Sequence, residues 1–323
     1  MKTLRLLITS AGRRAGLVQC FRADAAALGI ELEVIACDLE PELSAACHLA
    51  DRRFAVPPVT SADYVDAVLE ICRTYEVGLV VPTIDPELLP LSLARGRFEQ
   101  IGASVAVSSP ELVEIARDKL ETARFLARHD IPSPATAAAE DVRDNPDAWD
   151  WPLIVKARSG SASRGLRLVN EPSDLPDLTT SEPLVAQQRL TGTEYTVNVY
   201  FDGDGRLRTS VPHERIRVRA GEVEKGVTRR LPQLQDLAER IAAALPGPRG
   251  ALCFQAIVDD NGDASVFEIN ARFGGGYPLA HRAGAAFGRW LMEERLQLPS
   301  SANDDWRNGV TMLRYDAAVF IDS

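Results

Sequence analysis

The chain has 323 residues, of which 46% are hydrophobic and 25% charged, and its formal net charge is −10. These values are typical of a globular protein with two or three domains. The acidic balance argues against nucleic acid or an anionic membrane as a main partner. No apolar run approaches the ~20 residues of a membrane span, and residues 1–5 lead into a short strand, so we expect a cytoplasmic protein.

The first hundred residues alternate between apolar strands and helices. We expect strands at 4–9, 32–37, 78–82 and 104–107, and helices at 15–28, 62–75 and 86–96. This alternation predicts a Rossmann-like domain, residues 1–108, built on an open parallel sheet. The carboxyl ends of such strands face ligands, so Arg13, Asp38 and Asp85 are candidates for a non-nucleotide substrate site. Capping or loop solvation explains each of the three equally well.

The loop between the first strand and helix is a weak dinucleotide signal. Residues 10–16 contain Gly12 and Gly16 but lack the G-x-G-x-x-G pattern, although Asp38 lies at a suggestive distance. A Rossmann-type oxidoreductase that binds NAD is therefore an alternative. That reading leaves the last two thirds of the chain unexplained.

A helix start marks the end of the first domain. Ser109 is a candidate N-cap and Pro110 occupies the first helical position. We expect one helix to about residue 116 and another through residue 128, with Lys119 in this region. The polar stretch 140–150 is expected to be a connection.

A lysine and a glycine-rich loop form the first phosphate signal. The apolar strand 152–156 ends in Lys156, and residues 159–165 follow as a Gly/Ser loop whose backbone N–H groups can cradle phosphate. The order is not that of a Walker A loop, because the lysine precedes the glycines. Taken alone, such a loop is usually just a flexible hairpin. Its candidate ligands are Ser159, Gly160, Ser161, Ser163 and Gly165.

The second signal lies on a predicted hairpin. Strand alternation places Glu268, Asn270 and Arg272 on one face, and the turn at 259–263 brings Gln255 beside Glu268. Carboxylate and amide oxygens suit Mg²⁺, and a guanidinium suits phosphate. A solvated strand face gives the same alternation, so this pattern gains meaning only in combination.

The order of these elements resembles the ATP-grasp superfamily, and most closely its members like the carbamoyl-phosphate synthase large subunit. Five elements occur in this order: a cation, a strand lysine, a glycine loop, a strand with G-x-E at 192–194 and a final E-x-N-x-R. The resemblance covers almost the entire chain. The resemblance implies a Rossmann-like pre-ATP-grasp domain followed by a two-lobed ATP-grasp fold, hence mixed α/β and α+β classes. The implied boundaries are 1–108, 109–186 for the first lobe and 187–323 for the second lobe.

The resemblance also implies roles for individual residues. Lys119 and Lys156 contact ATP phosphates, and the loop 159–165 closes over the nucleotide. Adenine is held by a hinge that includes Gln187, Gln188 and Leu190, and Glu194 holds the ribose; Gln188 stands where the family often has Glu. Gln255, Glu268 and Asn270 are the implied metal ligands, and Arg272 is implied, with Lys156, in catalysis.

The implied chemistry is ATP-dependent ligation with Mg²⁺ or Mn²⁺, with two ions bound. A small-molecule carboxylate attacks the γ-phosphate, and an amine or similar nucleophile then displaces phosphate from the acylphosphate. Phosphoryl transfer of this kind needs positioning and charge neutralisation rather than a protein nucleophile. A catalytically silent nucleotide-binding regulatory or scaffold module is the alternative, and a homodimer is compatible with the first domain.

Other stretches carry less information. Alternation at 211–219 places Arg215, Arg217 and Arg219 on one face, so Arg215 and Lys225 are candidates for carboxylate recognition, with a solvated face as the alternative. The glycines at 274–276 suit either close approach to a ligand or a plain turn. We expect the apolar stretch 309–321 to be a closing strand. The five cysteines show no C-x-x-C spacing, and the four histidines no ligand pair, so we expect structural roles for them.

Overall fold

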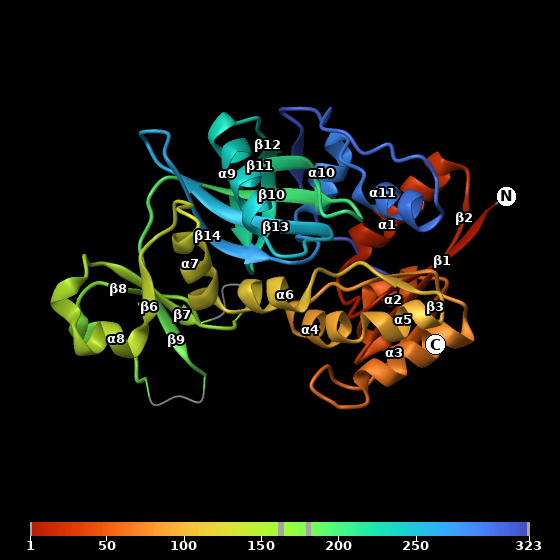
Figure 1. Cartoon of the computed structure of the whole chain (residues 1–323), viewed down its shortest axis with the longest axis horizontal. Helices are drawn as coiled ribbons and strands as arrows, with labels where there is room; N and C mark the ends of the chain where they lie inside the picture. The colour runs from red at the N-terminus through yellow and green to blue at the C-terminus, as the bar shows by residue number, and fades with distance from the viewer. Residues whose placement is uncertain (1, 161–164, 179–181, 322–323) are drawn as a thin grey trace.

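The structure is a computed structural model that describes residues 2–160, 165–178 and 182–321. Its strands form three sheets, and Figure 1 shows them as three bodies, with the amino-terminal domain and the small α8-bearing lobe at opposite ends. The sheets span residues 3–105, 136–188 and 193–313. The predicted combination of a parallel domain and a two-lobed region is confirmed.

The first sheet is parallel throughout, with strand order β3-β2-β1-β4-β5. Two elements are absent from the sequence prediction, namely β3 and α2, because both are short and the side chains of β3 are mostly exposed. The predicted helix 86–96 is two helices that meet at Ala94. The strands are β1 (Thr3–Ile8), β2 (Glu31–Asp38), β3 (Arg52–Ala55), β4 (Leu79–Val81) and β5 (Ser104–Val105), and the helices are α1 (Ala15–Leu28), α2 (Ala45–Leu49), α3 (Tyr64–Thr74), α4 (Asp85–Leu93) and α5 (Arg95–Gln100).

Two capped helices lead out of this domain. The Ser109 side chain accepts a hydrogen bond from the backbone N–H of Leu112 and starts α6 (Pro110–Arg117), as predicted. Asp118 accepts from Leu120 and Glu121 and starts α7 (Lys119–Arg128). Both helices pack against β14 (Ala264–Asn270) of the third sheet.

The second sheet has strand order β6-β9-β7-β8 and a small core of its own. The stretch 140–150, expected to be a connection, contains helix α8 (Ala139–Asp144), so that expectation is wrong. Ala139 and Val142 are fully buried on one side of this helix, and their three-residue spacing supplies the apolar stripe that holds it on the sheet. The strands are β6 (Thr136–Ala138), β7 (Leu153–Ala157), β8 (Arg167–Val169) and β9 (Leu184–Gln188).

The third sheet is antiparallel, with strand order β14-β13-β10-β11-β12-β15. The apolar stretch 309–321 supplies the expected closing strand over three residues only, as β15, which pairs with β12, and Tyr315 and Phe320 beyond it are 81% and 90% exposed. The remaining strands are β10 (Thr193–Phe201), β11 (Leu207–Arg219), β12 (Glu222–Thr228), β13 (Gly250–Val258) and β15 (Thr311–Leu313). The helices are α9 (Pro232–Ala244), α10 (Tyr277–Ala283) and α11 (Phe287–Arg295), and short 3-10 turns occur at Pro41–Leu43, Pro146–Ala148 and Pro172–Asp174.

Two hydrophobic cores join the first and third sheets. One core combines α3, α4 and α6 with α9 and the strands β10, β13 and β14. The other places α10 and α11 against α1, an arrangement that Figure 1 shows beside the first sheet. All five cysteines are buried and free, as expected. In the parts of the chain that the structure describes, no helix combines the length and apolar character needed to cross a membrane.

A buried ion pair links α1 to α10. His281 Nε2 lies 2.8 Å from Asp24 Oδ1, and the other oxygen of Asp24 accepts the backbone N–H of Arg289 at the start of α11. Burial opposes the charge of His281, but the bond to Asp24 outweighs it and raises the pKa of His281 to about 10. The imidazolium is therefore part of the contact between the two domains at neutral pH.

Substitution His281→Gln should destabilise the protein in a pH-dependent manner. Breaking a fully buried pair costs roughly 3–5 kcal/mol, and we expect about 2 kcal/mol here because His281 keeps 19% exposure. Because the folded pKa is raised above the ordinary value of 6.5, the stabilisation is complete below pH 6.5 and disappears as the pH rises through about 10. Chemical denaturation at several pH values measures this difference, with exposed His129→Gln as the control; a pH-independent difference would contradict the assignment.

Candidate active site

A cavity of about 290 Å³ opens between the second and third sheets. The strands β7 and β9 form one wall, and β10, β11, β13 and β14 form the other. The residues that line it include most of those selected from the sequence. Among the described residues, the complete lining of the cavity is Lys119, Ile154, Lys156, Ala157, Gly160, Leu166, Gln187, Gln188, Arg189, Leu190, Glu194, Arg215, Val218, Gln255, Ile257, Phe267 and Glu268.

Two buried lysines place positive charge in this cavity. Lys156 Nζ donates to Gln187 Oε1 at 2.8 Å and lies 5.5 Å from the centre of the Phe267 ring. Lys119 Nζ donates to the carbonyl oxygen of Gly160 at 2.5 Å. Burial lowers the pKa of Lys156 to about 8, against the opposing effect of Glu268. Among the described residues, neither lysine forms an ion pair with a carboxylate, so both can bind an anion.

The start of the glycine-rich loop is anchored to α7. Asp118, the N-cap of that helix, also accepts two hydrogen bonds from Arg158 Nε at 2.8 and 2.7 Å. Gly160 cannot be replaced without a shift, because a Cβ atom there would lie 2.8 Å from that of Ala157. Ser159 does not line the cavity, Gly165 has a φ of +71°, and Ser161 and Ser163 lie outside the described residues.

The predicted adenine hinge lines one end of the cavity. Gln187 is 5% exposed, and its amide bridges Lys156 and the hydroxyl of Thr136. Gln188 donates its side-chain amide to the carbonyl of Asp150 at 3.1 Å, and Leu190 contributes an apolar surface. Gln187 therefore fixes the lysine, while Gln188 keeps its carboxamide tied to the neighbouring loop.

Glu194 and Arg215 face each other on adjacent strands. Arg215 Nε lies 2.9 Å from Glu194 Oε1 as an ion pair without hydrogen-bond alignment, and Arg215 Nη1 donates to Thr196 Oγ1. Burial raises the pKa of Glu194, and Arg215 works against that rise. Arg215, Arg217 and Arg219 were expected to share one face, but they do not form one patch. Two register irregularities flank Arg217, and Arg219 pairs with Asp316. Lys225 lies opposite Leu313 and does not line the cavity.

Oxygen donors gather on the β13–β14 hairpin. Gln255 stands directly opposite Glu268, as the sequence predicted, and both line the cavity. Within the described parts of the chain, no ion pair or hydrogen bond of the Glu268 carboxylate is recorded, whereas Asn270 Oδ1 accepts from Arg272 at 3.2 Å. A single free carboxylate with two amides nearby is a set of hard oxygen donors.

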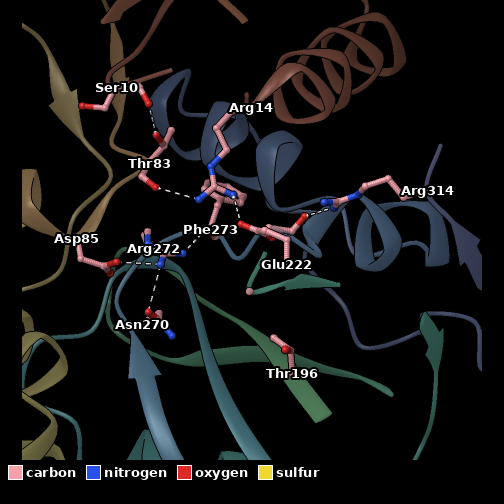
Figure 2. Close-up of polar contacts among 12 residues, drawn as sticks. Ser10, Arg14, Thr83, Asp85, Thr196, Glu222, Asn270, Arg272, Phe273 and Arg314 are labelled. Atoms are coloured by element: carbon pink, nitrogen blue, oxygen red, sulfur yellow. Dashed lines mark hydrogen bonds and ion pairs between the residues drawn. The ribbon is translucent and has the colours of Figure 1, made fainter. Parts of the chain in front are cut away.

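Beyond this hairpin the buried charges continue into the first domain (Figure 2). Arg272 Nη2 lies 2.8 Å from Asp85 Oδ2, at the start of α4, and Arg272 Nη1 donates to the carbonyl of Phe273. Arg14 donates to the carbonyl of Thr83 at 3.2 Å and lies 3.6 Å from Glu222. The contact between Arg272 and Asp85 joins a residue predicted to bind phosphate to a residue predicted to bind the substrate.

The sequence selected Arg13 for this place, but Arg13 is exposed and Arg14 points into the interface. No pattern distinguishes two adjacent arginines in a loop before their backbone geometry is known. Glu222 was missed for a related reason, since nothing in the strand marks it. The signal lay elsewhere in the sequence, at Gly275, where a Cβ atom would lie 1.3 Å from Glu222 Oε2. The run of glycines therefore makes room for this carboxylate.

Two further polar residues, Asp38 and His213, have structural roles. Asp38 accepts the backbone N–H of Gly12 at 2.7 Å, so its carboxylate holds the loop before α1. His213 is fully buried beside Asn198, and burial lowers its pKa to about 3, as expected of a core histidine.

The sequence matches two family descriptions in the same order as the domains. Residues 6–106 match the PylC-like N-terminal domain, and residues 116–276 match the ATP-grasp domain. The second match contains the cavity lysines, Glu194 and the whole β13–β14 hairpin. The chain belongs to the ATP-grasp superfamily.

Similar proteins in this superfamily are longer than this chain. The carbamoyl phosphate synthase large chain of Corynebacterium glutamicum is 27% identical over 55% of this chain and 16% of its own length. The formate-dependent phosphoribosylglycinamide formyltransferase of Synechococcus sp. is 30% identical over 61% of this chain and 47% of its own length. The chain thus spans less than half the length of either relative.

Solved ATP-grasp structures share the fold. The biotin carboxylase domain of the 2-oxoglutarate carboxylase from Hydrogenobacter thermophilus, solved with MgADP and bicarbonate, superposes with a TM-score of 0.75 at 14% identity. The match covers 96% of this chain and 74% of that one.

Lys156→Met should weaken the binding of a non-hydrolysable ATP analogue by about 100-fold, the loss expected for a buried charge-assisted contact. Because the pKa of Lys156 is about 8, the affinity of the unaltered protein should fall as the pH rises above 8, by at most about tenfold per unit. Calorimetric titration from pH 7 to 9 measures both effects. The variant should bind the ATP analogue weakly, with an affinity that changes less with pH. If the affinities of the variant and the unaltered protein changed equally with pH, the role given to Lys156 would be wrong.

Proposed function

We propose that this ATP-grasp protein is an ATP-dependent ligase that activates a small-molecule carboxylate as an acylphosphate and couples it to an amine or similar nucleophile. The observation that carries the proposal is the cavity itself. It gathers Lys119, Lys156, Glu194, Gln255 and Glu268 from four strands and a helix, and these were the residues that the superfamily's pattern selected. Phosphoryl transfer depends on this kind of positioning and charge placement.

We assign the nucleotide to the cavity with its phosphates toward Lys119 and Lys156. The apolar side chains of Ile154, Leu190 and Ile257 supply surfaces for the base, and Glu194 supplies oxygen acceptors for ribose hydroxyls. Arg215 keeps the Glu194 carboxylate in place at 2.9 Å. The lowered pKa of Lys156 indicates an unmatched buried cation, and phosphate would relieve that cost.

The residues on the hairpin fit a hard divalent cation such as Mg²⁺. Among the described residues, the Glu268 carboxylate forms no ion pair or hydrogen bond, and Gln255 and Asn270 offer amide oxygens beside it. One carboxylate is a small protein contribution, which suits Mg²⁺ held jointly with substrate phosphates. Such an ion would neutralise phosphate charge during transfer.

We propose that Arg272 holds the carboxylate that receives the phosphoryl group. It follows Asn270 at the end of β14 and is fixed by Asp85, so its guanidinium has a defined orientation. Neither Arg272 nor Asn270 lines the cavity itself, so we assign the carboxylate substrate to the region beside Arg272, next to the cavity. There its oxygen attacks the γ-phosphorus, and the bond between that phosphorus and the β-phosphate oxygen breaks. ADP leaves, an amine attacks the acyl carbon, and inorganic phosphate leaves with loss of a proton to water.

A nucleotide-binding regulatory module without turnover is the second candidate. A module released from catalysis need not keep Glu268, Asn270 and Arg272 together with both lysines, and all five remain. An NAD-dependent oxidoreductase has no comparable support, because it leaves the ATP-grasp match over residues 116–276 unexplained.

Glu268→Gln separates the ligase from the silent module. The substitution keeps the shape of the side chain but removes the charge, so ADP formation in the presence of Mg²⁺ and a panel of carboxylic acids should fall by at least about 100-fold. Binding of an ATP analogue without metal should persist. The exposed Asp260→Asn, in the turn of the same hairpin, is the control; unchanged turnover in Glu268→Gln would contradict the metal assignment.

A further inference from the structure

Four charged side chains meet where the first domain faces the end of β14 (Figure 2). Arg14 precedes α1, Asp85 begins α4, Glu222 begins β12 and Arg272 follows β14. Two of them therefore come from the first domain and two from the third sheet. Together they form the charge cluster discussed below.

The charges in this cluster alternate. Arg272 pairs with Asp85 at 2.8 Å, and Arg14 faces Glu222 at the longer distance of 3.6 Å. The side chains of Arg14, Asp85 and Arg272 are 20%, 14% and 13% exposed and that of Glu222 is 31% exposed, so solvent screens the first three least. Burial and the nearby charge of Arg272 lower the pKa of Arg14, against the opposing effect of Glu222 and Asp85, as expected of two guanidiniums that repel each other. An anionic group placed between them would remove that repulsion.

Some donors in the cluster have no protein acceptor. Within the described residues, the buried Nε of Arg272 makes no hydrogen bond. Arg14 engages one carbonyl through Nη2 and approaches Glu222 at 3.6 Å, beyond hydrogen-bond distance. Leaving such buried donors unpaired is costly, so the arrangement favours an external acceptor.

Helix α1 adds to the same preference. It has 14 residues, no side-chain cap at its amino end and no acidic residue in its first turn. The N–H groups of Arg14 and Leu17 already donate to the carbonyls of Ala11 and Arg14, and the helix dipole still favours an anion at that end. Arg14 is the residue directly before this helix, so both features favour negative charge at the same place.

The balance of charges indicates what kind of ligand fits. Two guanidiniums and two carboxylates sum to zero, so a ligand with a net charge would leave an uncompensated charge in a buried place. A zwitterion keeps the sum at zero and matches both signs, with its carboxylate toward the arginines and its ammonium toward Asp85 and Glu222. A plain carboxylic acid would satisfy only half of the cluster.

We propose that the charge cluster binds an amino acid and that this amino acid is the carboxylate that the ligase activates. The inference rests on the function proposed above. Arg14 and Arg272 hold the carboxylate, and Glu222 and Asp85 hold the ammonium group. Arg272 lies four residues beyond Glu268, which lines the cavity, so the proposal puts the bound carboxylate on the side of the cluster nearer to that cavity.

The cluster is held in shape by groups that do not touch the ligand. Glu87 is fully buried and accepts the backbone N–H groups of Thr83 and Ile84 at 2.6 and 3.0 Å, which fixes the carbonyl that Arg14 contacts. Arg314 donates to the carbonyl of Gly275 at 2.7 Å, beneath Glu222. We regard Glu87 and Arg314 as positioning residues.

The test measures ADP formation from Mg-ATP with hydroxylamine as a general nucleophile. Standard L-amino acids and their D enantiomers are screened, and each active compound is compared with the acid that lacks its amino group. Hydroxylamine nitrogen attacks the acylphosphate carbon, phosphate leaves, and the hydroxamate that forms identifies the activated acid. We expect hydroxamate from an amino acid and far less from its deaminated counterpart.

Two variants assign the residues. Arg14→Met should raise the KM for the active amino acid by about 30-fold, the loss expected for a charge-assisted hydrogen bond, with smaller change in kcat and unchanged binding of an ATP analogue. Glu222→Gln should reduce the preference for the amino acid over its deaminated form. Arg22→Met, an exposed arginine on α1, is the control and should stay within about twofold. Circular dichroism and the affinity for the ATP analogue show whether each variant is folded.

Three outcomes overturn the inference. Equal hydroxamate from deaminated acids would show that the cluster does not read the ammonium group. An amino acid that stimulates ADP formation only beside another acid would be the nucleophile instead. If Arg13→Met raised the KM for the amino acid and Arg14→Met did not, the amino acid would bind at Arg13 and not in the charge cluster. If no acid stimulates ADP release although the ATP analogue binds, the proposed ligase function itself fails, which is a separate result.

Discussion

The ion pair between Arg272 and Asp85 ties the chemistry of the site to the architecture of the molecule. It joins the end of β14 to the start of α4, at 2.8 Å and largely away from solvent. Burial disfavours the charge of Arg272, but Asp85 outweighs this effect and leaves the pKa of Arg272 raised. Removing two charges from water is costly, so such a pair contributes orientation more than stability. Through it, the first domain fixes the guanidinium that we assign to the carboxylate substrate, which receives the phosphoryl group.

The surrounding cores explain why that orientation is kept. The first and third sheets share two hydrophobic cores, one on each side of the parallel sheet, and the Asp24–His281 pair adds a charged contact between α1 and α10. Relative motion of these parts would expose apolar surface at about 25 cal/mol per Å². The β13–β14 hairpin and the charge cluster therefore belong to one frame held by these shared cores.

The sequence predicted the strands, helices and order of motifs better than the positions of individual side chains in the site. Helix α1 and the hairpin that pairs Gln255 with Glu268 were predicted because hydrophobic periodicity and a turn signal act locally. The lining of the cavity by Lys119, Lys156 and Glu194 was implied by the order of motifs. The choice between Arg13 and Arg14 depends on the φ of +46° at Ser10 and Gly12. The place of Glu222 depends on a contact with Gly275, 53 residues further along by sequence number, which no local pattern records.

The small core of the second sheet has a different consequence. Its buried members are Val142, Leu153, Val155, Val169 and Ala186, and none belongs to the two larger cores. Polar contacts join this lobe to α7, from Lys119 to Gly160 and from Arg158 to Asp118, and α7 in turn packs on β14. Motion of the lobe relative to the third sheet would therefore act on these contacts while leaving the two larger cores intact. It also follows that amide hydrogens of β6–β9 should exchange with solvent sooner than those of the shared frame, since a lobe with few buried contacts opens at low cost.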